Sequence, residues 1–308
     1  MTDRPRLTRR AALAGAAALP LAAGLARTAE AGAPMLGASA PLFNRVKLGD
    51  FDVTTLLAGT RAVPEPQNIF GMNVSADAFA EASAAARIPT DVAQFFFTPT
   101  VVNTGSELVL FDTGLSAEGT AAALAQAGYA PDQVDIVVIT HMHGDHIGGL
   151  MNGDAPTYGN ARYVTGAAEF NAWDKAGNDT FEARMRPVAE KTTFLDDGGA
   201  VAGGITAVAA FGHTPGHMTY MLESGGKQLL IAADFANHYV WSLAYPDWEV
   251  KFDRDKAAAA ATRKKILGML AADQVPFIGY HMPFPGIGYV EAKDSGFAYA
   301  PHSYQLML

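Results

Sequence analysis

Four side chains that can bind a metal ion fall within six residues of this sequence, in the run His141-Met142-His143-Gly144-Asp145-His146. Imidazole nitrogens and carboxylate oxygens are ordinary zinc ligands. A lone histidine here would more often be a satisfied polar group of a turn, but three histidines and an aspartate at this spacing favour a metal site. The run therefore predicts a metal centre.

Further metal-binding side chains follow later in the chain, each at the end of a predicted strand. They are His213 and His217 in a Gly-His-Thr-Pro-Gly-His motif, Asp234, and His281. Loops at the carboxyl ends of strands can aim several side chains at one point outside a sheet. Six of the chain's eight histidines belong to these groups, which strengthens the prediction of a shared site.

The elements that must position these side chains alternate between strands and helices. Strands are predicted at 51–57, 95–102, 108–111, 134–140, 162–164, 205–209, 218–222, 228–232 and 277–280, and helices at 75–86, 116–128, 167–176, 181–186 and 255–270. The 134–140 run, directly before the first ligand loop, is mostly apolar and β-branched, which indicates a strand buried on both faces. This order predicts two mixed sheets packed face to face with helices outside, an α/β four-layer αβ/βα sandwich.

The composition indicates a globular chain with an acidic surface. Apolar residues make up 49% and charged residues 17% of the 308 residues, which allows a sizeable core. The formal net charge of −9 argues against nucleic acid or an anionic membrane as partner. The run Arg263 to Lys265, on a predicted helix, is interpreted as a solvated face. The absence of cysteine excludes thiolate metal sites and cysteine nucleophiles.

The N-terminal segment has the features of a targeting signal. Thr8-Arg9-Arg10 precedes an apolar, alanine-rich stretch that reaches Ala26, and Ala29-Glu30-Ala31 offers a cleavage site between small residues. The apolar stretch is shorter than the ~20 residues that span a bilayer. We therefore expect residues 1–31 to be a twin-arginine signal peptide and residues 32–308 to be one domain without a membrane span. The mature protein is expected to be periplasmic or secreted.

The order H-x-H-x-D-H, GHTPGH, Asp, His makes residues from about 50 to 285 resemble the metallo-β-lactamase superfamily. The resemblance implies one metal ion held by His141, His143 and His213, and a second held by Asp145, His146 and His281. It also implies that Asp234 bridges the two ions together with a hydroxide. Two zinc ions are the default, and iron, manganese or cobalt can fill the same ligands.

Two residues near this ligand set are expected to orient ligands. His217 is the second histidine of the GHTPGH motif, which in the family is usually not a direct ligand. Asp112 lies in a Phe-Asp-Thr-Gly segment that matches the family's Asp-Thr-Gly. An ordinary turn aspartate is an equally weighted alternative for Asp112, because aspartate is common in turns for local reasons.

The chemistry that follows from two neighbouring divalent ions is hydrolysis. The ions lower the pKa of a shared water and polarise the scissile bond. The interpretation is therefore a binuclear-metal hydrolase whose bridging hydroxide attacks the substrate, while Asp145 passes a proton to the leaving group. A metal-binding protein without catalysis is an alternative, against which the intact ligand set argues.

Particular segments indicate the branch of the superfamily. β-Lactamases of this fold use a cysteine ligand or lack the bridging carboxylate, whereas this chain has no cysteine and has Asp234. Residues 102–106, 212–217 and 281–288 resemble the exported branch that contains methyl parathion hydrolase and acyl-homoserine-lactone-type lactonases. Tyr239 departs from this pattern, because it lies two positions away from the tyrosine that several lactonases place after the bridging aspartate.

A small neutral ester is the expected substrate. No lysine or arginine lies within a few residues of any expected ligand, which disfavours a dianionic phosphomonoester. A lactone or an aryl or carboxylic ester is favoured, with an organophosphate triester as the alternative. The substrate pocket is expected to include Trp173, Phe97, His238 and Tyr239, although Phe97 also fits a strand that faces the core. A homodimer is a further expectation.

Overall fold

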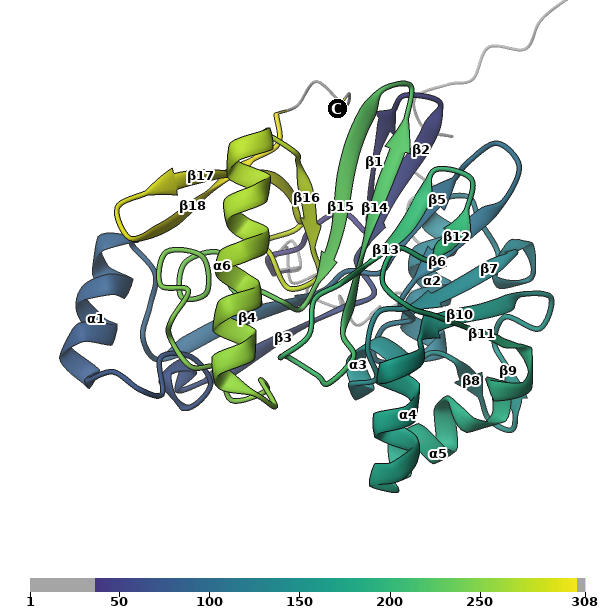
Figure 1. Ribbon diagram of the computed structural model, residues 1–308, viewed down its shortest axis with the longest axis horizontal. Helices are drawn as coiled ribbons and strands as arrows, with labels where there is room; N and C mark the ends of the chain where they lie inside the picture. The colour runs from purple at the N-terminus through teal and green to yellow at the C-terminus, as the bar shows by residue number, and fades with distance from the viewer. Residues whose placement is uncertain (1–36, 304–307) are drawn as a thin grey trace, which may run out of the picture. The chain divides into compact units, whose positions relative to one another are not determined.

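Two seven-stranded mixed sheets organise the chain (Figure 1). The computed structural model describes residues 37–303 and 308, and residues 40–308 belong to one unit. The expected signal peptide at 1–31 lies outside the described residues. Within the described residues, the helices are all too short or too polar to cross a membrane.

The first sheet has the strand order β1-β2-β5-β6-β7-β10-β11. Its strands are β1 (Phe43–Leu48), β2 (Phe51–Leu56), β5 (Thr100–Asn103), β6 (Leu108–Phe111), β7 (Ile136–Ile139), β10 (Arg162–Gly166) and β11 (Thr192–Leu195). The strands from β1 to β6 pair antiparallel, and those from β6 to β11 pair parallel. Parallel strands need crossover connections. The connecting helices are α2 (Ala117–Gln126), α3 (Gly144–Ile147), α4 (Ala167–Ala176) and α5 (Asp179–Arg184).

The second sheet follows the chain order from β12 to β18. Its strands are β12 (Ala200–Ala202), β13 (Ile205–Ala209), β14 (Met218–Ser224), β15 (Lys227–Ala233), β16 (Phe277–Gly279), β17 (Ile287–Lys293) and β18 (Gly296–Pro301). One pair, β15 with β16, is parallel, and α6 (Lys256–Asp273) connects these two strands. Their carboxyl ends therefore lie side by side, which brings the segments after both strands to the same edge of the sheet.

Apolar side chains separate the sheets and helices into four layers. Residues of both sheets, such as Val138 and Ile231, pack together between the sheets. Phe170 and Phe181 from α4 and α5 pack on the outer side of the first sheet, and Leu267 of α6 packs on the second. In Figure 1, α6 lies over the second sheet. The predicted α/β four-layer sandwich is confirmed.

A two-stranded sheet outside the main layers corrects one prediction. The expected single strand 95–102 is two strands, β4 (Val92–Phe97), which pairs with β3 (Gly59–Pro64), and β5, which belongs to the first sheet. The break falls at Pro99, which has no N–H with which to continue a ladder. The consequence is a two-stranded arm, whose strand β4 carries Phe95 and Phe97 to the cavity beside the ligand loops.

Helix starts agree with the sequence signals. The side chains of Ser75 and Ser116 accept backbone N–H groups at the starts of α1 (Ala76–Ala85) and α2, each at 3.2 Å. Such caps satisfy amides that have no partner inside the helix. The remaining short elements are β8 (Met151–Asn152), β9 (Ala155–Pro156) and the 3₁₀ turns Pro66–Asn68, Pro131–Gln133 and Arg186–Lys191.

Candidate metal centre

The seven side chains predicted as ligands converge from the ends of four strands. The loop after β7 supplies four of them, and the segments after β13, β15 and β16 supply one each. Three groups place one donor atom per residue within 4.8 Å of one another. These groups are His141, His143 and His213; His141, His146 and Asp234; and Asp145, His146 and His281.

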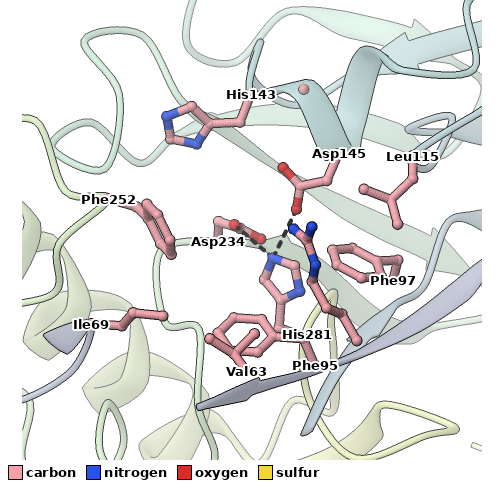
Figure 2. A pocket seen from close by; sticks show the side chains of 12 residues that line it. Val63, Ile69, Phe95, Phe97, Leu115, His143, Asp145, Asp234, Phe252 and His281 are labelled. Carbon is pink, nitrogen blue, oxygen red and sulfur yellow. Dashed lines mark ion pairs between the residues drawn. The ribbon is translucent and has the colours of Figure 1, made fainter. Parts of the chain in front are cut away.

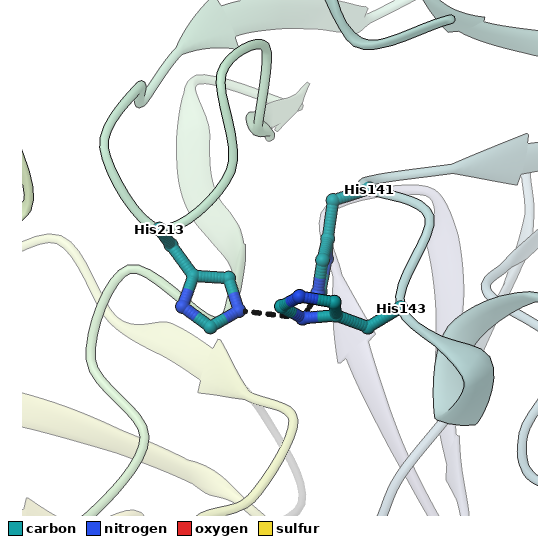
Figure 3. Close-up of side chains that lie close together, drawn as sticks. All are labelled: His141, His143 and His213. Carbon is teal, nitrogen blue, oxygen red and sulfur yellow. Dashed lines mark hydrogen bonds between the residues drawn. The ribbon is translucent and has the colours of Figure 1, made fainter. Parts of the chain in front are cut away.

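The first group is three imidazole rings that turn their nitrogens toward one another (Figure 3). Nδ1 of His143 lies 3.1 Å from Nε2 of His141 and 3.0 Å from Nε2 of His213. The rings of His141 and His143 meet nearly edge to face, at 84°. Three nitrogens that approach one central point from different directions form one face of a tetrahedral site.

The second group joins a carboxylate to two histidines. Oδ2 of Asp145 lies 3.6 Å from Nε2 of His146 and 3.3 Å from Nε2 of His281. Tyr280 donates its hydroxyl to the backbone carbonyl of Asp145 at 2.5 Å and packs its ring over His146. These contacts hold the carboxylate and imidazole donors on one side of the cluster.

Asp234 lies between the two groups. Its Oδ2 is 3.2 Å from Nε2 of His281 and 3.4 Å from Nε2 of His146. The same oxygen is 3.5 Å from Nε2 of His213 and 3.9 Å from Nε2 of His141. Asn237 donates to it at 3.1 Å. One carboxylate thus faces histidines of both groups, and it would be placed to contact an ion held by either group.

The donor set fits a pair of cations. Nε2 of His146 and Oδ1 of Asp234 are buried and have no hydrogen-bond partner among the described residues. A buried polar atom without a partner is costly, and a bound cation would satisfy both atoms. Nitrogen and carboxylate donors without thiolate suit zinc and also iron, manganese or cobalt.

The protonation states of the cluster follow from its burial and its charges. Burial and the neighbouring histidines hold the pKa of His141 well below its ordinary value, and burial lowers the pKa of His143 to about 3. Burial opposes charge on Asp145, but His146 and His281 together outweigh it and the pKa falls to about 2. Carboxylates likewise overcome burial at His281 and raise its pKa to about 10. Metal binding at the second group would therefore displace protons.

A cavity of about 460 Å³ opens onto this cluster (Figure 2). Its lining residues are Arg61, Val63, Ile69, Phe95, Phe97, Leu115, His143, Gly144, Asp145, Asp234, Phe252 and His281. The expected pocket residue Phe97 lies in this lining. Arg61, from β3, brings a positive charge into the cavity that spacing along the chain did not reveal.

The remaining expected pocket residues lie elsewhere. Trp173 is buried behind the ligand loop, where its ring meets His143 edge to face at 5.7 Å. His238 and Tyr239 line a separate cavity of about 300 Å³, which shares His281 with the first. Strand β4 explains this separation, because its successive side chains point to opposite faces.

The family model described as the metallo-beta-lactamase superfamily matches residues 98–277, a span that includes six of the seven expected ligands. The chain belongs to the metallo-β-lactamase superfamily. No curated protein sequence matches it significantly.

Several solved structures share the fold over nearly their whole length. AidC, a dizinc quorum-quenching lactonase, is 24% identical with a TM-score of 0.79, covering 86% of this chain and all of AidC. The hydrolase AbOPH is 25% identical with a TM-score of 0.77, covering 87% of this chain and all of AbOPH. A probable metal-dependent hydrolase from Staphylococcus aureus is 19% identical with a TM-score of 0.69, covering 83% and 99%.

Asp112 and His217 lie behind the metal-binding side chains, where Asp112 contacts His146 and His217 contacts the backbone of Asp234. Oδ2 of Asp112 is 2.8 Å from Nδ1 of His146, and its Oδ1 accepts the backbone N–H of Thr140 at 2.9 Å. Nε2 of His217 accepts the backbone N–H of Asp234 at 3.0 Å. Such partners fix the ring orientation of a ligand and the path of its backbone.

A buried ion pair behind His213 was missed by the sequence reasoning. Nδ1 of His213 lies 2.9 Å from Oδ1 of Asp253, whose Oδ2 accepts from Arg263 at 2.8 Å. Arg263 is fully buried in α6 and also donates to the carbonyls of Phe235 and Pro246. The interpretation of Arg263 as part of a solvated face is therefore wrong, whereas its neighbour Lys264 is exposed. The hydrophobic pattern of a helix cannot reveal a buried arginine that has such partners.

Glu169 of α4 joins the two histidine-bearing loops. Its Oε1 accepts the backbone N–H of Met142 at 3.0 Å and the indole N–H of Trp173 at 2.7 Å. Its Oε2 accepts from the Thr214 hydroxyl at 2.7 Å and from the backbone N–H of Gly216 at 2.9 Å. Burial raises its pKa, and these four donors oppose that rise. The carboxylate therefore holds the loop of His143 and the loop of His213 together.

Replacing Glu169 with glutamine should weaken metal binding by about 10- to 100-fold, the usual effect of losing a partner behind a ligand. The amide cannot accept from all four donors, so the two loops lose one connection. Competition for zinc against a chromophoric chelator measures this effect. Glu118→Gln, on the exposed start of α2, is the matched control. Equal zinc affinity in both variants would contradict the role given to Glu169.

Proposed function

We propose that this protein is a two-metal hydrolase of small neutral esters, with lactones as the first candidate. The observation that carries the proposal is the convergence of seven donors, with Asp234 between the two groups, at the base of a largely apolar cavity. Metal-binding groups at the base of such a cavity suit a substrate with one polar reacting bond and an apolar remainder. Several similar solved structures are lactonases, which supports the choice of first substrate.

The cavity favours an acyl or aryl group over a strongly charged one. Val63, Ile69, Phe95, Phe97, Leu115 and Phe252 provide its apolar lining. Arg61 is the cavity's single lysine or arginine among the described residues, and its exposed side chain has no hydrogen-bond partner in that part of the chain. A second oxygen of an ester substrate can accept from this guanidinium without the substrate carrying a charge.

The residues of the site account for the chemistry of ester cleavage. When bound, two divalent ions would polarise the carbonyl and lower the pKa of a water molecule. The water oxygen adds to the carbonyl carbon, and the bond between that carbon and the alcohol oxygen breaks. The Asp145 side chain is 23% exposed, against 4% for Asp234. Asp145 is therefore the carboxylate that can take a proton from water and deliver it to the departing alcohol oxygen.

Parallel turnover of three substrates by the zinc-reconstituted protein tests the proposal. The substrates are an N-acyl-homoserine lactone, 4-nitrophenyl acetate and a dialkyl 4-nitrophenyl phosphate. We expect the lactone or the aryl ester to have the highest kcat/KM. We also expect His143→Ala to remove turnover of all three, because it deletes one donor of the first group.

The same assay separates the alternatives. Dominant turnover of the phosphate triester would replace the proposed substrate class with organophosphate triesters. Binding of two metal ions per chain without turnover of any substrate would instead favour a protein that binds metal without catalysis. Activity that survives in His143→Ala would contradict the assignment of the site.

A further inference from the structure

The second cavity lies on the opposite face of β4 from the metal site. Phe95 and Phe97 line the metal cavity, whereas Gln94 and Phe96, which alternate with them, line the second cavity. The volume of about 300 Å³ is at the lower end of the range for small-molecule sites. The same strand therefore forms a wall of both cavities.

His238 offers a fixed hydrogen-bond donor at this second cavity. Its Nδ1 accepts the backbone N–H groups of Val240 and Trp241, each at 3.1 Å, so the ring proton must lie on Nε2. The side chain is 8% exposed and stacks on Trp241 with ring centroids 4.0 Å apart. Burial lowers the pKa of His238 to about 3, which keeps the ring neutral. This tautomer is imposed by the backbone and does not depend on a ligand.

The donor at Nε2 is unused in the described structure. Nε2 has no hydrogen-bond partner among the described residues, yet it is not one of the fully enclosed polar atoms. Because His238 lines the second cavity, the open side of its ring is available to an occupant of that cavity. His238 is nine-tenths buried as a residue, and its one accessible donor, Nε2–H, can pair with an acceptor on an occupant of the cavity.

The walls define the chemistry of the occupant. Among the described residues, the lining contains no aspartate, glutamate, lysine or arginine. Ile88, Val92, Phe96 and Trp241 offer apolar and aromatic surface instead. The one charged group that the described residues bring to the wall is His281, and both of its ring nitrogens are engaged, by the Phe96 carbonyl and by the carboxylates of Asp145 and Asp234. A charged ligand would therefore lose its hydration without gaining a free partner of opposite charge. A neutral, mainly apolar molecule with one acceptor oxygen matches both the walls and the donor.

We propose that the second cavity is a binding site for a neutral, largely apolar small molecule, whose carbonyl or ether oxygen accepts from Nε2 of His238. This site goes beyond the proposed hydrolase activity and is separate from the substrate cavity. It adjoins the metal centre at Phe96, whose carbonyl accepts from Nδ1 of His281 at 2.8 Å. An occupant that packs against Phe96 therefore also limits movement of the Phe96 carbonyl, which orients the ring of His281.

Binding of 4-fluoroacetophenone to the zinc-loaded full chain, followed by fluorine NMR, tests this proposal. The probe is a neutral aryl ketone that ester hydrolysis cannot consume. Val92 and Leu115 are both exposed apolar residues, at 38% and 44%, but Val92 lines the second cavity and Leu115 the metal cavity. We expect Val92→Trp to weaken binding at least about tenfold and Leu115→Trp to leave it unchanged.

A third variant examines the donor itself. His238→Phe keeps the stacked ring and removes Nε2–H, so it should weaken binding of the ketone by up to about tenfold. It also leaves two backbone N–H groups without an acceptor, so circular dichroism must show a native fold. Val92→Trp does not carry this risk. Absence of binding to the wild type up to the solubility of the ketone would overturn the proposal. Loss of binding only in Leu115→Trp would also overturn it, because the ketone would then occupy the metal cavity.

Discussion

Asp234→Asn should lower kcat/KM for the best ester substrate by about a thousandfold, which corresponds to about 4 kcal/mol. Asparagine keeps the shape of the side chain but removes the charge that faces four histidines at 3.2–3.9 Å. Without that charge, two cations at the cluster would repel each other with less compensation. Zinc content after dialysis should therefore fall below two ions per chain, together with turnover.

Asp247→Asn is the matched control for this substitution. Asp247 is an exposed aspartate whose side chain pairs with Lys264 on the surface. It should retain both full activity and full zinc content. If Asp234→Asn keeps wild-type turnover with two bound ions, Asp234 cannot be the bridging ligand.

Arg263→Met should reduce the free energy of unfolding by about 3–5 kcal/mol, the usual cost of breaking a buried ion pair by removing one partner. The substitution leaves Asp253 buried with its negative charge unpaired, although the methionine fills much of the same volume. Asp253 also positions His213, so zinc affinity should fall as well. Urea unfolding of the metal-free protein measures the stability effect separately from the metal effect.

Lys264→Met provides the comparison on the same helix. Its pair with Asp247 is solvated, and exposed pairs contribute between zero and about 1 kcal/mol. A large loss of unfolding free energy in Arg263→Met and a small one in Lys264→Met would show that burial decides how much an ion pair contributes to stability. Equal effects at the two positions would contradict the role given to the buried pair.

The ligand segments could be predicted from the sequence because each has a local signal. The loop 141–146 directly follows an apolar run, and Asp234 and His281 end two others, so the order of strands is enough to bring them together. The four-layer arrangement followed from the same order. By contrast, β3 and β18 were not predicted, because the mostly exposed residues of β3 and the half-buried residues of β18 show no strong apolar alternation.

The residues that support the ligands could not be found in this way. Asp253 and Glu169 reach His213 and the ligand loop only through tertiary packing, and nothing in their neighbours along the chain indicates a metal site. Arg61 enters the cavity from β3, whose pairing with β4 no local signal in the sequence indicates. The separation of His238 from the metal cavity likewise depends on which face of β4 each side chain of that strand takes.

The two sheets share the donors unequally. The loop 141–146, after a strand of the first sheet, contributes four donors, and segments after strands of the second sheet contribute His213, Asp234 and His281. The first and last donors are therefore 140 positions apart in the sequence. During synthesis, a nascent chain cannot assemble the complete donor set until residue 281 has been added and the sheets have packed. Metal uptake would thus report completed folding. Once bound, the ions would stabilise the packed sheets against separation, because they bind the native state in preference to the unfolded one.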